Sequence, residues 1–468
     1  MSMGSSRFTI PARPTPEPGR EFKLVARTQA EEDAYDIRAN RQMPKPSGLI
    51  GSIAHLVKGA LGGGILSGHV AWMTAGLWVA VPVSLVCGIY MFYCLYILVK
   101  SAQILYKRTR VPVMTYPDVG EAACACHSNP SVSKYSKTFR YMIDAMICID
   151  LFGACATYQI IIAKSLKQLV ENSQTTSMEG LNGLPGLRVY LAGLVPFVIL
   201  ICLIRHLKWL APLSIVANMV VLFCIIVAVY YAFDNNPTLT GMVPYTSFYN
   251  FFEFIGMAVF SMSCAAVIIP IENNMKDPSK YHIALSIGMS LIITCVFCVS
   301  FFGYAGYLDK CESPITVNFP LNTLGKALKA CIMVMIYVTH ALNYWVPFST
   351  VFYYMKRKLD PNKHVMWEFV FRAVFVALIG LVAIIFPTIT ALMGFLGAFC
   401  LSNLAFIYPN VIYLLVHWER PGLGPFRWRL WVSCIMILVG VFFCICGSFV
   451  SGVQLISIAL NPGKRSDI

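Results

Sequence analysis

The chain contains long apolar runs that recur from about residue 48 almost to its C-terminus. Each run has about 20 residues, which is enough for a helix to cross roughly 30 Å of hydrocarbon. Because only helices and closed barrels satisfy their backbone hydrogen bonds inside lipid, runs of this length predict helical membrane spans. Hydrophobic residues make up 57% of the sequence and charged residues only 12%, a balance that a soluble domain does not need. The sequence therefore predicts an all-α polytopic membrane protein.

We expect eleven transmembrane helices, arranged as two sets of five with one extra helix. The first set occupies residues 48–234, the second occupies residues 249–417, and the eleventh span covers 430–456. The approximate bounds of the spans are 48–72, 77–103, 141–169, 189–205, 210–233, 249–271, 281–303, 326–355, 366–387, 389–416 and 430–456.

The two ends of the chain are predicted to lie on opposite sides of the membrane. Residues 1–47 are polar, proline-rich and mixed in charge, so we expect a disordered tail. Most of the 36 lysines and arginines lie in this tail and in the loops after the even-numbered spans, which places the N-terminus in the cytoplasm. With an odd number of spans, residues 457–468 form an extracellular or lumenal tail. The same loops account for the net charge of +14, so no nucleic-acid partner is expected.

The first span is interrupted in its middle by three consecutive glycines, Gly62, Gly63 and Gly64. Glycine loses about 1 kcal/mol of helix preference per residue, and an unwound backbone is tolerated in lipid only where protein buries it or a cavity adjoins it. A broken span of this kind indicates the substrate site of a secondary transporter. The alternative is close helix packing, because Gly59 and Gly63 are four residues apart.

Span 6 carries a second interruption. Residues 260–266 are small or polar, and Pro270 follows them. Spans 1 and 6 hold the same position in the two sets of five, which predicts a LeuT-like 5+5 inverted repeat whose two breaks meet near the middle of the membrane. An ordinary proline kink is the alternative for span 6.

A free amino acid would suit a site between two such breaks. Its carboxylate can bind unpaired N–H groups at the start of the second half of span 1, where the helix dipole is also favourable. Its ammonium group can bind carbonyl groups freed in span 6. The predicted substrate-binding residues are Gly62, Gly63, Gly64, Ile65, Ser261, Ser263 and Cys264.

Ionisable residues inside spans are candidates for a functional role. His55 lies one turn inside span 1, and its ordinary pKa near 6.5 suits a proton carrier, although it could equally reach the interface. Asp150 in span 3 could bind a proton or a cation, whereas Asp144 lies nearer the interface. The spans show no clustered metal ligands and no nucleophile paired with a base, so we expect neither an enzyme nor a metal cofactor.

Four ordered motifs resemble the amino acid/auxin permease family, in particular its proton-coupled amino acid transporter-like branch. They are residues 55–59 (His-Leu-Val-Lys-Gly) with the glycine break, 115–121 (Thr-Tyr-Pro-Asp-Val-Gly-Glu), 270–276 (Pro-Ile-Glu-Asn-Asn-Met-Lys), and 303–307 with 315–320 (Ile-Thr-Val-Asn-Phe-Pro). The resemblance covers about residues 48–456.

The resemblance implies a LeuT-like fold and proton-coupled transport of small neutral amino acids across the plasma membrane or a lysosomal or endosomal membrane. It also assigns the proton site to the position of His55. The coupling ion would be the proton, and the partners would be amino acids and the lipid bilayer.

The sequence departs from the branch in the broken part of span 6. Residues 262–266 read Met-Ser-Cys-Ala-Ala, where the branch usually has an acidic residue and two glycines. This departure motivates an alternative: an amino-acid sensor or signalling protein with a transporter fold, little or no flux and an unknown signalling partner.

Overall fold

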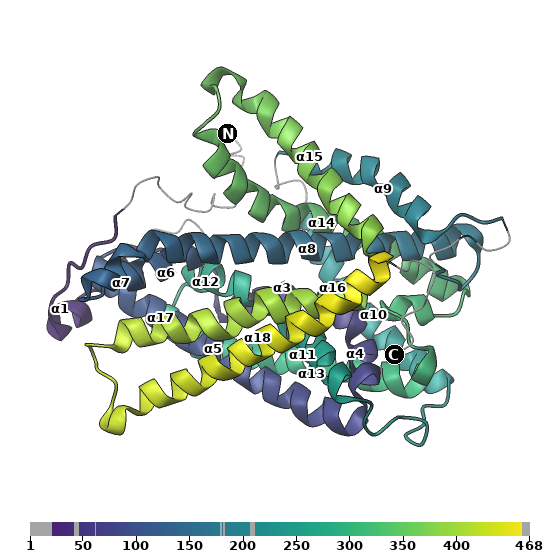
Figure 1. Cartoon of the computed structure of the whole chain (residues 1–468), viewed down its shortest axis with the longest axis horizontal. Coiled ribbons are helices and arrows are strands. Elements are labelled where there is room, and N and C mark those ends of the chain that lie inside the picture. Colours follow the sequence, from purple (N-terminus) through teal and green to yellow (C-terminus); the bar gives the residue numbers. More distant parts are fainter. Residues whose placement is uncertain are drawn as a thin grey trace, which may run out of the picture.

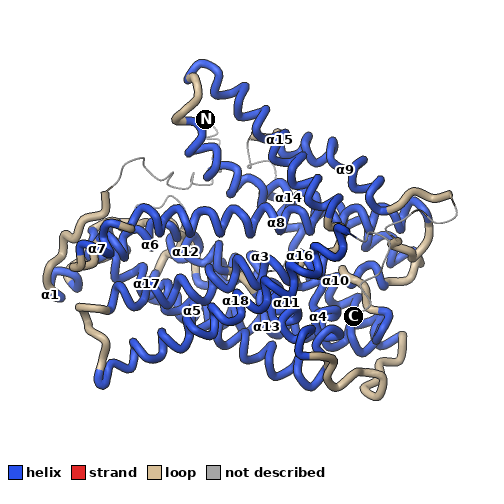
Figure 2. The backbone as a smooth tube through the Cα atoms, viewed as in Figure 1, coloured by secondary structure: helices blue, strands red, loops and turns tan. Residues whose placement is uncertain are grey.

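The computed structural model describes residues 21–41, 46–60, 62–177, 180, 183–205 and 211–460. Across these ranges the chain is a set of helices and loops, joined at one place by a bridge between Ser47 and Met275 (Figure 2). The predicted all-helical class is confirmed.

Within the described ranges, eight single helices or runs of successive helices are long and apolar enough to cross a membrane. They are α5 (Leu77–Thr109), α8 (Ser136–Glu171), α11 with α12 (Phe248–Met262 and Ala265–Asn273), α13 (Tyr281–Tyr307), α14 (Thr323–Lys356), α15 (His364–Ile385), α16 with η7 and α17 (Ile389–Leu396, Gly397–Ile407 and Tyr408–His417) and α18 (Trp428–Leu460).

A ninth candidate span is broken, and two further apolar helices are shorter. The broken pair is α3 (Leu49–Ala60) and η1 with α4 (Ile65–Ser67 and Gly68–Ala75), which bend by 47° at the break. The shorter apolar helices are α9 (Leu187–Cys202) and the part Met219–Asp234 of α10 (Ala211–Asp234), and they coincide with predicted spans 4 and 5. The count of eleven spans and the two-fold repeat therefore stay predictions.

The longest of these helices, α8, runs through the middle of the molecule (Figure 1). It packs against α14, α15, α9, α16 and η7, and against the short loop helix α6 (Tyr116–Ala125). By contrast, α18 lies on the outside and exposes large side chains such as Phe442, Ile445 and Phe449. Apolar residues on this outer face are what contact with lipid tails requires.

The bundle has two opposite ends. We call the end that carries residues 21–41 and α6 the tail face; α1 (Gln29–Asp33), α6 and α7 (Pro130–Lys134) gather there in Figure 1. The end that carries residues 308–322 is the loop face. Helix α13 runs from the tail face to the loop face. It begins shortly after the segment that hydrogen-bonds to the backbone of Ser47, and it ends at Tyr307, just before the loop.

The described part of the N-terminal tail, residues 21–41, is folded against the tail face, while residues 1–20 and 42–45 of the tail predicted to be disordered lie outside the described residues. The Arg41 guanidinium lies 2.9 Å from the buried Glu272 carboxylate at the end of α12, and Arg108 of α5 lies 2.9 Å from Glu32. The composition suggested a solvated segment because it is rich in charge. These charges are instead compensated by partners more than 70 residues away in the chain.

A capping box begins α1. Thr28 accepts from the backbone N–H of Glu31, and the Glu31 carboxylate accepts from the N–H groups of Arg27 and Thr28. These hydrogen bonds, that of Arg27 first, lower the pKa of the Glu31 carboxyl. The local sequence therefore favours a helix start at this position.

Candidate substrate site at two helix breaks

The first break is held open by close contact with α8. Helix α3 ends at Ala60, and helical structure resumes at Ile65. A Cβ on Gly62 would lie 2.9 Å from the Tyr158 hydroxyl, and a Cβ on Gly63 would lie 2.8 Å from Cδ1 of Ile161. Only glycine permits this approach of the backbone to α8 without displacing a neighbour.

The second break lies between α11 and α12. Ser263 follows α11 with an extended backbone (φ −75°, ψ 131°), and Cys264 precedes the first residue of α12. The Ser263 hydroxyl accepts from the N–H of Ala265 at 3.4 Å. Small side chains at this turn leave the backbone close to the neighbouring helices.

The two breaks touch each other. The Ser261 hydroxyl lies 3.0 Å from the Gly64 carbonyl oxygen and 2.8 Å from that of Met257. A Cβ on Gly64 would lie 3.1 Å from the Cα of Ser261. The prediction that the interruptions in spans 1 and 6 meet is thus confirmed, whereas the substrate roles of their residues are not tested by this contact.

Burial divides the seven predicted substrate residues into two groups. Gly63, Gly64, Ile65, Ser261 and Cys264 are buried, while Gly62 and Ser263 are partly exposed. The predicted proton carrier, His55, is exposed and lies seven residues before Gly62, about two helical turns toward the tail face. Its imidazole makes no hydrogen bond to the described residues.

The loop face is closed over the breaks by the segment 311–320. On the side of α4, the Ser67 and Ser313 hydroxyls lie 2.5 Å apart, and Nε2 of His69 lies 2.9 Å from the Glu312 carbonyl oxygen. Asn318 donates to the same carbonyl at 2.7 Å. Side chains of the first span thereby hold the loop.

The same loop is also bonded to α8 and α14. Lys164 donates to the Ser313 carbonyl at 2.7 Å, and the fully buried Lys329 donates to the Phe319 carbonyl at 3.1 Å and to Gln168 at 2.8 Å. From the sequence, these lysines counted only as charges outside the centres of spans 3 and 8, on the side opposite the N-terminus. Their role depends on contacts across more than 100 residues, and the intramembrane position of a lysine next to a loop was the one available signal.

A further buried acidic residue was not predicted from the sequence. Glu253 of α11 is buried beside Gly394 of α16 and shares a hydrogen bond with Gln454 of α18. An acidic residue in the apolar run of span 6 could have marked it. Asp144, in contrast, accepts from the Tyr354 hydroxyl at 2.7 Å, so this carboxylate has a structural partner.

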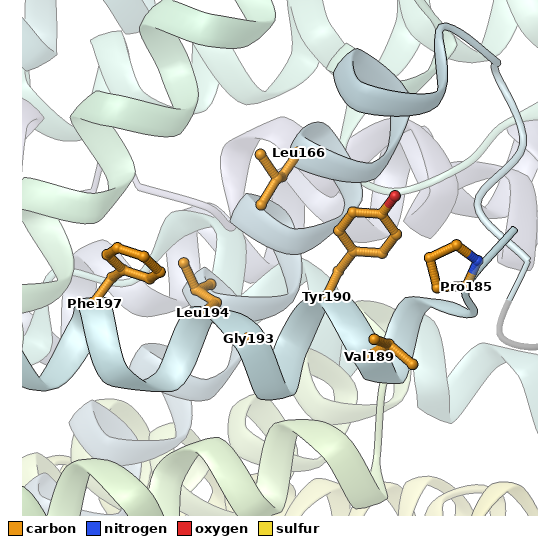
Figure 3. Close-up of a pocket in the computed structure, with 7 residues that line it drawn as sticks. All are labelled: Leu166, Pro185, Val189, Tyr190, Gly193, Leu194 and Phe197. Carbon is orange, nitrogen blue, oxygen red and sulfur yellow. The ribbon is translucent and has the colours of Figure 1, made fainter.

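A surface hollow of about 290 Å³ lies between α8 and α9, away from the breaks (Figure 3). It is lined by Leu166, Pro185, Val189, Tyr190, Gly193, Leu194 and Phe197. Its apolar lining suits a lipid tail, and none of the residues of either break contributes to it.

The fold and the two touching breaks define a membrane transporter of the broken-helix type. The structure is similar to Mhp1, a nucleobase-cation-symport-1 family transporter, in a closed conformation with bromovinylhydantoin bound. The TM-score is 0.51 at 14% identity, over 90% of this chain and 94% of that one. At this identity the similarity supports the fold alone.

The chain belongs to the transmembrane amino acid transporter family, whose sequence profile matches residues 45–453. It is 31% identical over 449 residues to the proton-coupled amino acid transporter-like protein pathetic of Drosophila melanogaster, covering 92% of this chain and 90% of the relative. It is 23% identical over 451 residues to the probable amino acid transporter skat-1 of Caenorhabditis elegans, covering 92% and 96%.

These relatives place the chain in the branch that the four motifs indicated. Its relatives are named as transporters, so the chain is a multi-pass membrane transporter family member and not an enzyme.

Proposed function

We propose that the protein is a proton-coupled secondary transporter of small neutral amino acids, with its substrate site between the breaks of spans 1 and 6. The observation that carries this proposal is the contact between Gly64 and Ser261, which joins the break in span 1 to the last turn of α11 before the break in span 6. Unwound backbone at membrane depth is tolerated where it serves a buried site.

The composition of the breaks favours a zwitterion with an uncharged side chain. The backbone N–H groups around Gly64 and Ile65 lie at the start of the second half-helix, where the dipole attracts a carboxylate. Carbonyl groups around Ser263 can accept from an ammonium group. The seven predicted substrate residues carry no charged side chain, so a charged substrate would find no counter-charge among them.

Burial differs between the two halves of span 1. In α4, six of eight residues are buried, whereas in α3 only three of twelve are. The loop over α4 is closed by hydrogen bonds to α8 and α14. We infer that this conformation admits substrate from the tail face, and that transport requires the spans 1 and 6 to rock against α8 until the loop opens.

Proton coupling is proposed from two supports. The name of the Drosophila relative includes proton coupling, and His55 lies exposed on α3, on the accessible side of the break. Protonation there would change the charge of the helix that must move.

We further propose eleven spans in a 5+5 repeat with one extra helix, and a cytoplasmic N-terminus in a plasma, lysosomal or endosomal membrane. A short helical segment follows the second span of each set, α6 on the tail face and η5 (Ile315–Asn318) on the loop face. Their opposite positions fit an inverted repeat.

The test is uptake of labelled glycine, alanine, serine and proline by proteoliposomes, with Gly64→Val as the variant. Valine introduces a branched side chain against the backbone of Ser261 and should abolish uptake and binding together. Gly51→Ala is the matched control, because its Cβ meets only ordinary contacts. Saturable uptake by Gly64→Val at the rate of the unmodified protein would refute the site.

A sensor is the second candidate, because α12 connects the break to the tail. The helix begins next to Cys264 at the break, and its penultimate residue, Glu272, binds Arg41 of the tail. An amino acid that shifts α12 would alter the tail docking. Thermal stabilisation by an amino acid that is not taken up would favour this function, and saturable uptake of the same amino acid would exclude it.

A further inference from the structure

Asp150 of α8 carries a buried carboxyl group without a partner. Its side chain is 7% exposed, and Oδ1 is fully buried without a hydrogen bond. Neither carboxyl oxygen bonds to, or forms an ion pair with, any of the residues that the structure describes. This distinguishes Asp150 from Asp144, six residues earlier, which is bonded to Tyr354.

The carboxyl group faces an unusual segment of span 10. Its electrostatic neighbours are Tyr158 on its own helix and Cys400 on η7. The segment η7 is π-helical over eleven residues, and Gly153 of α8 packs against Leu396 just before it. Wide turns of this kind recur at functional sites because they disturb the regular hydrogen-bond ladder.

A second unpartnered polar atom lies directly after this segment. The Tyr408 hydroxyl, on the first residue of α17, is buried without a hydrogen bond, and Cys400 is one of its electrostatic neighbours. Two buried polar groups in this region, the Asp150 carboxyl and the Tyr408 hydroxyl, therefore have no hydrogen-bond partner among the described residues, which is unusual for a membrane interior.

Asp150 is connected to the first helix break through one face of α8. Asp150, Ala154 and Tyr158 follow one another at four-residue spacing, so they lie on one side of the helix over about 12 Å. The Tyr158 hydroxyl accepts from Asn343 at 3.1 Å, and its ring contacts the backbone of Gly62 and Gly63. A change at Asp150 can thus reach the break through one tyrosine.

The other titratable or charged groups on the elements around Asp150 are already paired or do not bond to it. Toward the tail face, Arg140 is held by Asp118 and Glu121. On α14, His340 contacts Gln159 and Cys202. In the described ranges, Cys148 and Cys155 on α8, Glu253 on α11 and Tyr344 on α14 make no hydrogen bond to Asp150.

We propose that Asp150 is a proton-binding site of the transport cycle, located between α8 and η7. An ionised carboxylate buried without a partner costs several kcal/mol, so in this conformation the carboxyl group holds a proton. Met146 and Gly153, one turn away on either side, are partly exposed, so the carboxyl group lies about one helical turn from the surface of the described bundle. Motion of spans 1 and 6 against α8 would open a path to water and release the proton.

The proposal rests on the proposed function, since it assigns a residue to proton coupling. A metal or sodium ion is the less suitable occupant, because one carboxyl group with a tyrosine and a cysteine offers few of the oxygen ligands that hard cations need. No group of three or more potential metal ligands is present in the described ranges.

The first test compares Asp150→Asn, Asp150→Glu and the control Asp144→Asn in proteoliposomes. Two rates are measured for each: amino acid exchange at equal pH, and accumulation driven by an imposed gradient of one pH unit. One-proton coupling supports up to about tenfold accumulation across that gradient. Asp150→Asn should keep exchange within about twofold and lose accumulation, while Asp150→Glu and Asp144→Asn accumulate.

The outcomes separate the two proposals. Accumulation by Asp150→Asn overturns the role of Asp150, as does a parallel loss of exchange and accumulation in monodisperse protein, or accumulation that follows a sodium gradient instead. Absence of proton-driven accumulation in the unmodified protein overturns the proposed function, and the role of Asp150 falls with it.

The second test needs no variant. Dicyclohexylcarbodiimide reacts with protonated carboxyl groups in apolar surroundings, so the unmodified protein should be labelled at Asp150 and not at Asp144. Mass spectrometry of the two peptides reads this directly. Labelling of Asp150 that is no greater than that of Asp144 at pH 6 would overturn the proposal.

Discussion

Replacement of Arg41 by methionine should release the N-terminal tail from the tail face. The Arg41 guanidinium donates to both carboxylate oxygens of Glu272, to its carbonyl at 3.0 Å and to the Pro112 carbonyl at 2.7 Å. It also lies 5.0 Å from the centre of the Tyr106 ring. Methionine keeps much of the apolar volume but none of these hydrogen bonds.

The magnitude follows from what remains around Glu272, whose side chain is fully buried. Removal of one partner from a buried ion pair costs about 3–5 kcal/mol. Gln103 at 3.0 Å and Tyr106 at 3.3 Å still donate to the carboxylate, so the lower end applies, about 3 kcal/mol. This corresponds to roughly a hundredfold change in the docking equilibrium.

Hydrogen exchange with mass spectrometry measures that equilibrium in lipid nanodiscs. Amides of residues 21–41 should exchange up to about a hundredfold faster in Arg41→Met, or until they reach the rate of an unstructured peptide, while α5 and α13 keep their protection. Adding Glu272→Gln removes the unpaired charge and should restore part of the protection. Lys23→Met is the control, since its ion pair with Glu21 is exposed. An Arg41→Met tail that exchanges within threefold of the unmodified tail would refute this reasoning.

Three further predictions concern the bundle. In Gly397→Ala the new Cβ would overlap backbone atoms of α11, so the substitution should lower stability by at least about 1–3 kcal/mol, and with it the apparent Tm. Gly452→Ala, with open space around its Cβ, should be neutral or stabilising. Equal melting temperatures for the two variants would contradict the close packing of η7 against α11. Lys329→Met should loosen the loop-face loop and speed maleimide labelling of Cys311 in the folded protein, because burial raises the pKa of that thiol and shields it in the unmodified chain. The labelled fraction is read from the Cys311 peptide after digestion, and an unchanged rate would argue against closure by Lys329. His55→Ala should remove the pH dependence of uptake, and uptake that keeps its pH dependence removes that assignment.

The helices and the two breaks could be predicted because each depends on local sequence. A run of about 20 apolar residues has few alternatives to a membrane helix. Gly62, Gly63 and Gly64 weaken the helix where they stand. The closeness of Tyr158 and Ile161 to Gly62 and Gly63, and of Ser261 to Gly64, explains why no side chain is present there.

The tail, the loop closure and the environment of Asp150 required the structure. Arg41 and Glu272 are 231 residues apart, and Lys329 and Gln168 are 161 apart. No periodicity reports such pairs. The π-helical segment η7 was likewise read as an ordinary span, because hydropathy depends on composition and does not distinguish one helical hydrogen-bond pattern from another.

The most direct test of the central claim is uptake of labelled small neutral amino acids into proteoliposomes with the interior alkaline, compared with no pH gradient. Proton-coupled transport predicts saturable uptake of at least one amino acid that rises with the gradient and collapses with a protonophore. Uptake that is absent, or that does not respond to the gradient for any amino acid of the panel, would contradict the account.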